Sequence, residues 1–446
     1  MRLSLPDAVR NPISVVGMTV ATAAAWLFLA LFLLEIFGYF TNPYVGLLVF
    51  VVVPLVFVAG LLLIPFGIWV SARRRESGKP ELDWPVIDLR QPHQRGIVFG
   101  VLALTFVNVL ILSAAGFGTV HYMERTEFCG QVCHTTMQPE FVAHQAWPHS
   151  QVACVSCHVG AGAGSLIEAK LAGTRQLYHL ATNQVPRPVP TPVRALGRPD
   201  ETCLLCHRPT RIIGDKRKLV REYANDEGNS ETVTTLTLHV GSPVDRAGAG
   251  IHRHIAYDIE YVTTDERRET IPFVRVTGAE GTREYRAEGV TDEQIAGGVR
   301  RRMDCTDCHN RPAHTMSATP ERAIDAAIAA ERIPRTLPFV RREAVAAVSA
   351  EYADADAALD AIARRLSAFY AERAGTDAAL VKQAIASTQD VWSRNVFPKM
   401  QVKFGTYPNH LGHIDTPGCF RCHDDSHKSA DGRTISQDCE LCHVIE

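Results

Sequence analysis

The chain of 446 residues has no unpaired cysteine in its sequence pattern. All twelve cysteines fall into pairs, and a histidine follows the second cysteine of every pair. A disulfide framework or a zinc ribbon gives no reason for that histidine, so both are excluded as the purpose of the pairs. With 12 Cys and 18 His in the chain, chance would produce roughly 0.01 such five-residue matches.

The sequence also lacks a charge imbalance. It has 46 Lys and Arg against 48 Asp and Glu, a formal net charge of −2. Basic residues are not clustered beside aromatic ones, as they are in nucleic-acid-binding surfaces, so we exclude nucleic acid as a partner. The chain also shows no dedicated catalytic constellation.

The cysteine pairs form six haem-attachment signatures. Five read Cys-x-x-Cys-His, and the first has three residues between its cysteines. In this signature the thiols bind the haem vinyl groups and the histidine becomes an axial iron ligand, which predicts six covalent haem c groups. The attachment cysteines are Cys129, Cys133, Cys154, Cys157, Cys203, Cys206, Cys305, Cys308, Cys419, Cys422, Cys439 and Cys442. The proximal iron ligands are His134, His158, His207, His309, His423 and His443.

Charge is nearly absent from three long apolar runs that begin near Ile13, Tyr44 and Ile97. Each exceeds the roughly 20 residues that a helix needs to cross a bilayer. We therefore predict transmembrane helices at about 13–37, 44–70 and 97–119. A cleavable signal peptide fits the first run less well, because its small residues lie in the middle of the run.

The loops between these runs predict the orientation. The turn Gly38–Tyr44 has no Lys or Arg, whereas Ser71–Gly96 carries six. The positive-inside bias then places the second loop and the N-terminus in the cytoplasm, and everything after about residue 120 outside it. This predicts a bacterial inner-membrane protein with its haem region on the periplasmic side. Glu35, near the outer end of the first run, is either an interfacial acid or part of a docking surface for a membrane partner.

The expected fold is a membrane-anchored multihaem cytochrome c with three transmembrane helices. Its extracytoplasmic region is predicted to be mainly α and organised by haem, with a small β insertion where apolar residues alternate around Gly278. Thr319-Pro320 is a typical helix start. The expected parts are an anchor at 1–123, a tetrahaem module at 124–314 with its insertion at about 208–300, a helical segment at 315–400 and a dihaem segment at 401–446.

The remaining histidines are candidates for the distal iron positions, because a neutral imidazole is the default second ligand of a low-spin haem. His413 precedes the fifth motif and His427 follows it, so we expect them to serve haems five and six, with His410 in reserve. His252, His254 and His179 are candidates for haem two.

Part of the chain resembles a known family. An apolar run leads into the first motif, and His149 stands shortly before Cys154-Val-Ser-Cys157-His158. The fourth motif reads Cys305-Thr-Asp-Cys308-His309-Asn-Arg-Pro-Ala-His314. This arrangement resembles the NapC/NirT/NrfH family of membrane-anchored tetrahaem quinol dehydrogenases, over about residues 97–207 and 300–314. The larger layout resembles inner-membrane cytochromes of extracellular electron transfer.

The resemblance implies several iron ligands. His314 is expected on the third haem and His149 on the fourth. The family's first motif usually reads Cys-x-x-Cys-His-x-Met, and here Met137 follows His134 with one extra residue in each gap. Met137 is therefore expected at the first iron. A purely structural methionine is the alternative, with His121 or His144 as the ligand instead.

The resemblance also implies a quinol pocket beside the first haem, built by a Lys and an Asp from the helix after the second motif. Lys170 matches the lysine within one residue, but Gln176 stands where the acid is expected. A glutamine can donate a hydrogen bond to a quinol yet cannot take its proton. The quinol-binding candidates are thus Lys170, Gln176 and His179, and a lysine at the lipid headgroups is the alternative for Lys170.

These features together predict oxidation of menaquinol or ubiquinol and relay of the electrons to a periplasmic cytochrome or reductase. Two alternatives stay open. The chain is a wiring subunit whose quinone site belongs to another membrane subunit, or it is a terminal reductase with one open iron position.

Overall fold

A computed structural model describes residues 11–36, 52–78, 90–93, 95–96, 99, 103, 122–132, 134–159, 162–193, 196, 198–199, 202–244, 250–278 and 281–446. Nearly all of the expected third span at 97–119 and the turn at 38–44 lie outside these residues. The chain forms two compact units, Met1–Glu124 with Val159–Thr174, and Arg125–His158 with Arg175–Glu446.

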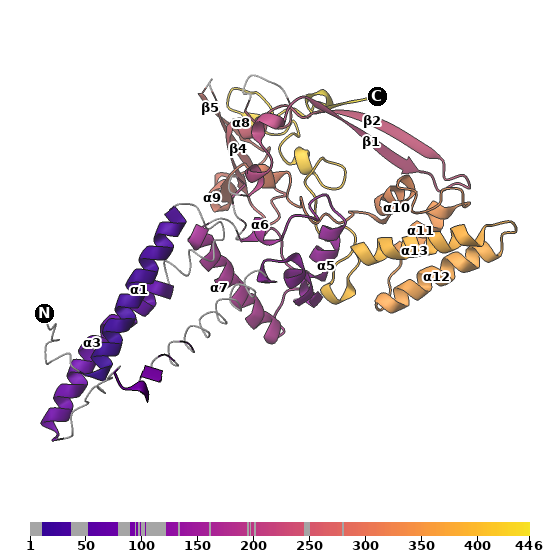
Figure 1. Cartoon of the computed structure of the whole chain (residues 1–446). Coiled ribbons are helices and arrows are strands. Elements are labelled where there is room, and N and C mark those ends of the chain that lie inside the picture. Colours follow the sequence, from indigo (N-terminus) through magenta and orange to yellow (C-terminus); the bar gives the residue numbers. More distant parts are fainter. Residues whose placement is uncertain are drawn as a thin grey trace. The chain divides into compact units, whose positions relative to one another are not determined.

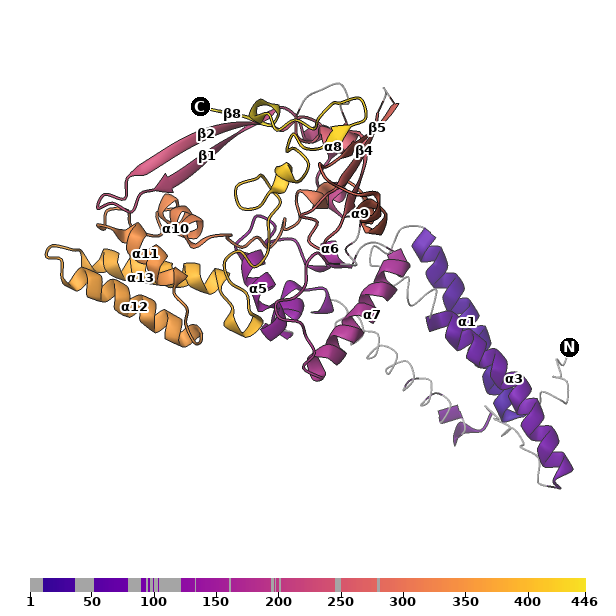
Figure 2. The same ribbon diagram turned by 180° about the vertical axis from the view of Figure 1, so that it is seen from behind.

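The first unit contains two apolar helices, α1 (Pro12–Ile36) and α3 (Val53–Glu76), which pack side by side (Figures 1 and 2). Glycines let the two backbones approach closely. A methyl group added at Gly17 would lie 2.7 Å from the carbonyl oxygen of Gly60, and one added at Gly60 would lie 2.7 Å from the backbone nitrogen of Ala21. Such small-residue contacts are typical of helix pairs in membranes.

Within the described part of the chain, α3 is the one helix long and apolar enough to cross a membrane. It extends past the expected end near residue 70 and finishes on three arginines. The guanidinium of Arg73 lies 5.2 Å from the ring centre of Trp69. Aromatic and basic residues in this position are typical of a membrane–water boundary.

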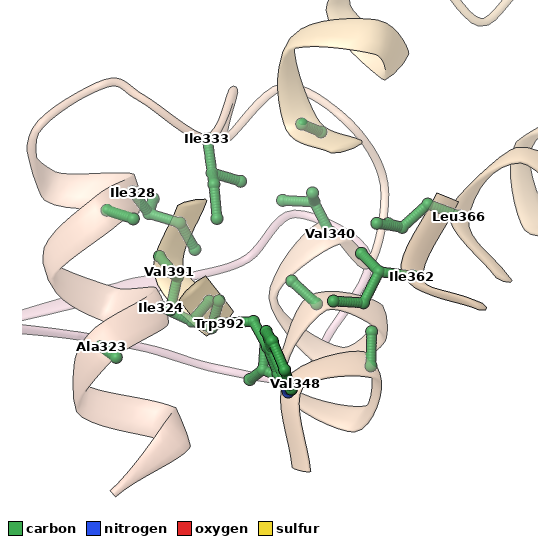
Figure 3. Close-up of a cluster of buried hydrophobic side chains, with 14 of the residues drawn as sticks. Ala323, Ile324, Ile328, Ile333, Val340, Val348, Ile362, Leu366, Val391 and Trp392 are labelled. Atoms are coloured by element: carbon green, nitrogen blue, oxygen red, sulfur yellow. The ribbon is translucent and has the colours of Figure 1, made fainter. Parts of the chain in front are cut away.

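Four helices form a module with its own apolar core in the second unit. They are α10 (Pro320–Ala329), α11 (Val340–Ser349), α12 (Ala355–Ala371) and α13 (Ala378–Asn395). Ile324, Ile362 and Leu366 are completely buried in this core (Figure 3). The Thr319 hydroxyl accepts a hydrogen bond from the backbone of Arg322 and so caps the start of α10.

Two antiparallel sheets occupy much of the region between the third and fourth motifs. The first has the order β1-β2-β8, and the second has the order β6-β3-β4-β5-β7. The strands are β1 (Asp215–Tyr223), β2 (Glu231–His239), β3 (Asp258–Thr263), β4 (Phe273–Gly278), β5 (Gly281–Arg286), β6 (Val299–Arg302), β7 (Lys428–Ser429) and β8 (His443–Ile445). Each sheet ends in a strand from the C-terminal segment, so these sheets are shared with the dihaem segment.

The attachment motifs form short turns rather than long helices. In the second to fifth motifs, the N–H of the motif histidine donates to the carbonyl of the first cysteine, at 2.8–3.1 Å. The first motif differs, because Phe128–Val132 forms a π-helical turn before α5 (His134–Gln145) begins. A π turn holds one more residue than an α turn, and this motif has one more residue between its cysteines than the other five.

Candidate haem-attachment sites

Cysteines of successive motifs lie within electrostatic range of one another. A hydrogen bond with Cys129 lowers the pKa of Cys154 to about 6. Burial raises the pKa of the Cys157, Cys305, Cys308 and Cys442 thiols, and a cysteine of the neighbouring motif raises it further, namely Cys203 for the first two and Cys419 for the last two. These interactions connect each motif with the next along the chain.

Five motif histidines each face a second histidine. Ring centres are 6.3 Å apart for His158 and His314, 5.8 Å for His207 and His149, 6.2 Å for His309 and His252, 5.6 Å for His423 and His254, and 6.0 Å for His443 and His413. A metal–imidazole bond is about 2 Å long, so two imidazoles on opposite sides of one metal have ring centres about 6 Å apart. The five pairs therefore fit an iron between their rings.

The pair His254 and His423 shows which nitrogens would meet that iron. Nδ1 of His254 lies 2.6 Å from the carbonyl oxygen of Ile251, and Nδ1 of His423 lies 2.8 Å from that of Ser436. Because a carbonyl only accepts, each Nδ1 carries the proton and each Nε2 keeps a lone pair. The two Nε2 atoms nevertheless face each other at 3.4 Å, an arrangement that a metal ion between them explains.

Two further distal histidines are oriented in the same way. Nδ1 of His149 lies 2.8 Å from the carbonyl oxygen of Pro312, and Nδ1 of His252 lies 3.1 Å from that of Val240. Such hydrogen bonds fix the tautomer and the ring plane of a metal ligand. Burial also lowers the pKa of His254, which favours the neutral imidazole that binds iron.

His314 is held by a carboxylate instead. Its Nδ1 lies 2.8 Å from Oε2 of Glu140, and the same oxygen accepts a hydrogen bond from Nη2 of Arg311 at 2.7 Å. Burial opposes ionisation of Glu140, but the contacts with His314 and Arg311 outweigh it and lower the pKa of Glu140. A negative charge beside Nδ1 makes an imidazole a stronger donor to a metal.

One short helix supplies the partners of two different motifs. His252 immediately precedes α8 (Arg253–Ala256), and His254 lies within it. The two rings face His309 and His423, which belong to the fourth and fifth motifs. Two histidines separated by a single residue can therefore serve two neighbouring irons.

His427 faces no motif histidine among the described residues. Its Nδ1 lies 2.9 Å from Oδ1 of Asp424, and its Nε2 lies 2.7 Å from the carbonyl oxygen of Ile271. Both ring nitrogens are thus engaged in the interior. His254 and His413 stand opposite the fifth and sixth motifs, for which His413 and His427 were expected. The reserve candidate His410 is buried too, with Nε2 3.1 Å from the carbonyl oxygen of Arg267.

The first motif is described only in part. Cys133, the side chain of His134 and all of His121 lie outside the described residues. Met137 is half-buried on α5. His144, on the same helix, is buried with Nε2 3.0 Å from the carbonyl oxygen of Val152.

The quinol-binding candidates lie on α7 (Gly162–Ala181), the helix that follows the second motif. The side chain of Lys170 lies outside the described residues, and Gln176 is exposed. The half-buried ring of His179 packs edge-on against Tyr178, with ring centres 5.9 Å apart.

The geometry pairs the histidines differently from the sequence-based expectations. His314 faces the second motif, where the family resemblance implied the third, and His149 faces the third, where the resemblance implied the fourth. His252 and His254, assigned from spacing to haem two, face the fourth and fifth motifs.

The chain is similar to known c-type cytochromes. The model of the NapC/NirT cytochrome c family, N-terminal region, matches residues 91–189. The cytochrome c-type protein ImcH of Geobacter sulfurreducens is 38% identical over an alignment of 446 positions, which covers 98% of this chain and 88% of that protein. No solved structure matches the chain.

Proposed function

Because the chain belongs to the NapC/NirT family of membrane-anchored c-type cytochromes, we propose that it carries six haem c groups and relays electrons from membrane quinol to a periplasmic redox partner. Haem c supplies reversible one-electron chemistry when it is attached. The observation that supports a relay best is that five of the six motif histidines each face a second histidine, with ring centres 5.6–6.3 Å apart. A pyridine haemochrome assay with protein quantitation should give six haems per chain, and a reproducible five would remove the irregular first motif.

Five of the irons would have histidine on both sides. The chain's part is to hold each imidazole neutral and correctly oriented, through the carbonyl contacts of His149, His252 and His254 and the carboxylate contact of His314. Two histidine ligands leave an iron no open position for substrate. A terminal reductase would therefore have to use the first haem, and a relay needs no open position at any of the six.

The histidine pair at the fifth motif, His254 and His423, offers a matched test. His254→Ala should convert one low-spin haem to high spin in EPR or magnetic circular dichroism, because it removes a ring whose Nε2 faces Nε2 of His423. His427→Ala is the control, since its nitrogens contact Asp424 and Ile271. The opposite result, an unchanged spectrum for His254→Ala and a lost low-spin signal for His427→Ala, would reverse the assignment.

For the first iron we propose Met137 as the axial ligand, as the family resemblance implies. The wild type should then show a thioether–iron charge-transfer band at the red end of the spectrum, and Met137→Leu should abolish it. If the band is absent and every haem has two histidines, Met137 is structural, and His144→Gln tests the buried alternative on the same helix.

We place quinol oxidation near the first haem, with Lys170 as the main binding residue and Gln176 and His179 as further candidates. A menaquinol analogue should reduce most haems of the purified protein, and a quinol-site inhibitor should prevent this. Lys170→Ala should slow reduction without loss of haem, whereas Lys216→Ala on strand β1 should not. Reduction that occurs only in the native complex would assign the quinone site to another membrane subunit.

A further inference from the structure

The fourth and fifth motifs are tied together by residues that the haem-attachment signature leaves unspecified. Arg421 is an interior residue of the fifth motif, between Cys419 and Cys422. Its Nη2 donates a 2.6 Å hydrogen bond to the carbonyl oxygen of Asp307, an interior residue of the fourth motif. The guanidinium of one attachment motif therefore binds the backbone of the preceding one.

Further contacts make this link rigid. Nη1 of Arg421 donates to the carbonyl oxygen of Arg268 at 2.8 Å, and Nε donates to that of Gly418 at 2.7 Å. All three nitrogens of the guanidinium group are thus occupied by backbone carbonyls from three separate places in the chain. A planar, multiply bonded guanidinium fixes orientation in a way that a flexible lysine cannot.

The side chain of Asp307 completes the link from the other direction. Asp307 is only 2% exposed, and it accepts hydrogen bonds from Nη1 of Arg268 at 3.0 Å and from the hydroxyl of Tyr261, which is fully buried. Its second oxygen accepts from the backbone nitrogen of Asp304 at 2.8 Å. Buried polar groups are costly unless they are fully paired, so a network of this kind permits little movement.

The opposite side of the same junction is joined as well. His252 and His254, separated by one residue, face His309 and His423 of these two motifs. The fourth and fifth sites are therefore connected both through their attachment turns and through their distal histidines.

We infer that Arg421 and Asp307 are positioning residues that fix the fourth and fifth haems relative to each other. The inference rests on the proposed function, because it requires haem at both motifs. Electron transfer between fixed cofactors falls steeply with their separation, so a rigid junction keeps this step fast. The network adds no ligand to either iron and acts only through the positions of the two motifs.

Arg421→Gln tests this inference in the full-length, haem-loaded protein. The variant should keep six haems and its low-spin ligation, but it should weaken the magnetic interaction between neighbouring ferric haems in EPR. Electron equilibration within the protein after flash reduction should slow by about tenfold. Arg421→Lys, which keeps the charge but not the planar fork, should restore only part of both signals.

The matched control is Arg433→Gln. Arg433 lies in the same C-terminal segment, is largely exposed and approaches only Asp431 among acidic partners in the described region. It should leave both signals unchanged. A fully loaded Arg421→Gln protein with wild-type haem interaction and equilibration would overturn the inference.

A second variant tests the inference if the Arg421→Gln protein does not fold. Asp307→Asn keeps the backbone carbonyl that Arg421 binds but removes the charge facing Arg268. It should weaken the same EPR interaction, and an unchanged interaction would again overturn the inference. Fewer than six haems in the wild type would instead count against the proposed function.

Discussion

The helical module and the dihaem segment are neighbours in sequence but are stabilised differently. In the module, α10 to α13 surround completely buried aliphatic side chains such as Ile324 and Leu366. After Tyr407 the buried side chains are polar, namely His410, His427 and Ser429. The module supplies its own apolar core, whereas we expect the segment that carries the last two motifs to depend on haem for its organisation.

Removal of haem should therefore produce the largest difference in stability between the helical module and the dihaem segment. In Cys419→Ser/Cys422→Ser, which cannot attach the fifth haem, we expect the chain after about residue 408 to become accessible to protease. Residues 320–395 should stay protected, because their core contains no attachment motif. Limited proteolysis followed by mass spectrometry measures both regions at once. Equal loss of protection in the module would show that its core also depends on haem.

A substitution in the core of the module should destabilise the module and leave the dihaem segment unaffected. Leu366→Ala removes a completely buried side chain from α12 and should lower the free energy of unfolding of the module by about 2–5 kcal/mol. Far-UV circular dichroism in denaturant reports this change, while the haem absorption spectrum should remain that of the wild type. Ser367→Ala, at the next and exposed position, is the control. An altered low-spin spectrum in Leu366→Ala would mean that the core also positions haem.

A smaller effect is expected where a charge contacts a haem ligand. Glu140→Gln removes the carboxylate 2.8 Å from Nδ1 of His314. The midpoint potential of one haem should rise by tens of millivolts, because a less basic imidazole stabilises the oxidised iron less. Potentiometric titration of the full set of haems measures this shift, with Glu372→Gln, exposed at the end of α12, as the control. Unchanged potentials would show that this carboxylate only shapes the backbone.

The smallest effect is expected at the module surface. Asp390 pairs with Arg332 and Arg394, and all three side chains are well exposed to solvent. Asp390→Asn should therefore change the free energy of unfolding by less than about 1 kcal/mol, and added salt should reduce the difference further. A larger loss would mean that the α13 surface contributes more to the module than its core suggests.

Local patterns in the sequence identify much of this molecule. The attachment motifs are fixed by cysteine and histidine spacing, and α10 begins directly after Thr319, the residue expected to cap it. The pairing of histidines across the fold is harder to predict from the sequence, because it joins residues as far apart as His254 and His423. The same limit applies to β8, which completes a sheet begun by β1 and β2 more than 200 residues earlier.

The two positioning residues could not be predicted from the sequence, for a different reason. Asp307 and Arg421 occupy positions that the attachment signature leaves free, so no motif draws attention to them. Their role depends on the fourth and fifth turns lying within hydrogen-bond distance of each other. Similarly, Glu140 belongs to no motif, and only its contact with His314 connects it to a haem site.

The order of the histidine pairs has a consequence for biosynthesis. The histidines that face the third to sixth motifs (His149, His252, His254 and His413) all precede the motif that they face. Among the five described pairs, His158 alone faces a histidine, His314, that comes later in the chain. Because the chain is synthesised from its N-terminus, we expect the second haem to be attached before the third, yet to gain its second histidine only after the fourth motif has been made. Assembly intermediates arrested before residue 314 should therefore carry one five-coordinate, high-spin haem amid completed neighbours.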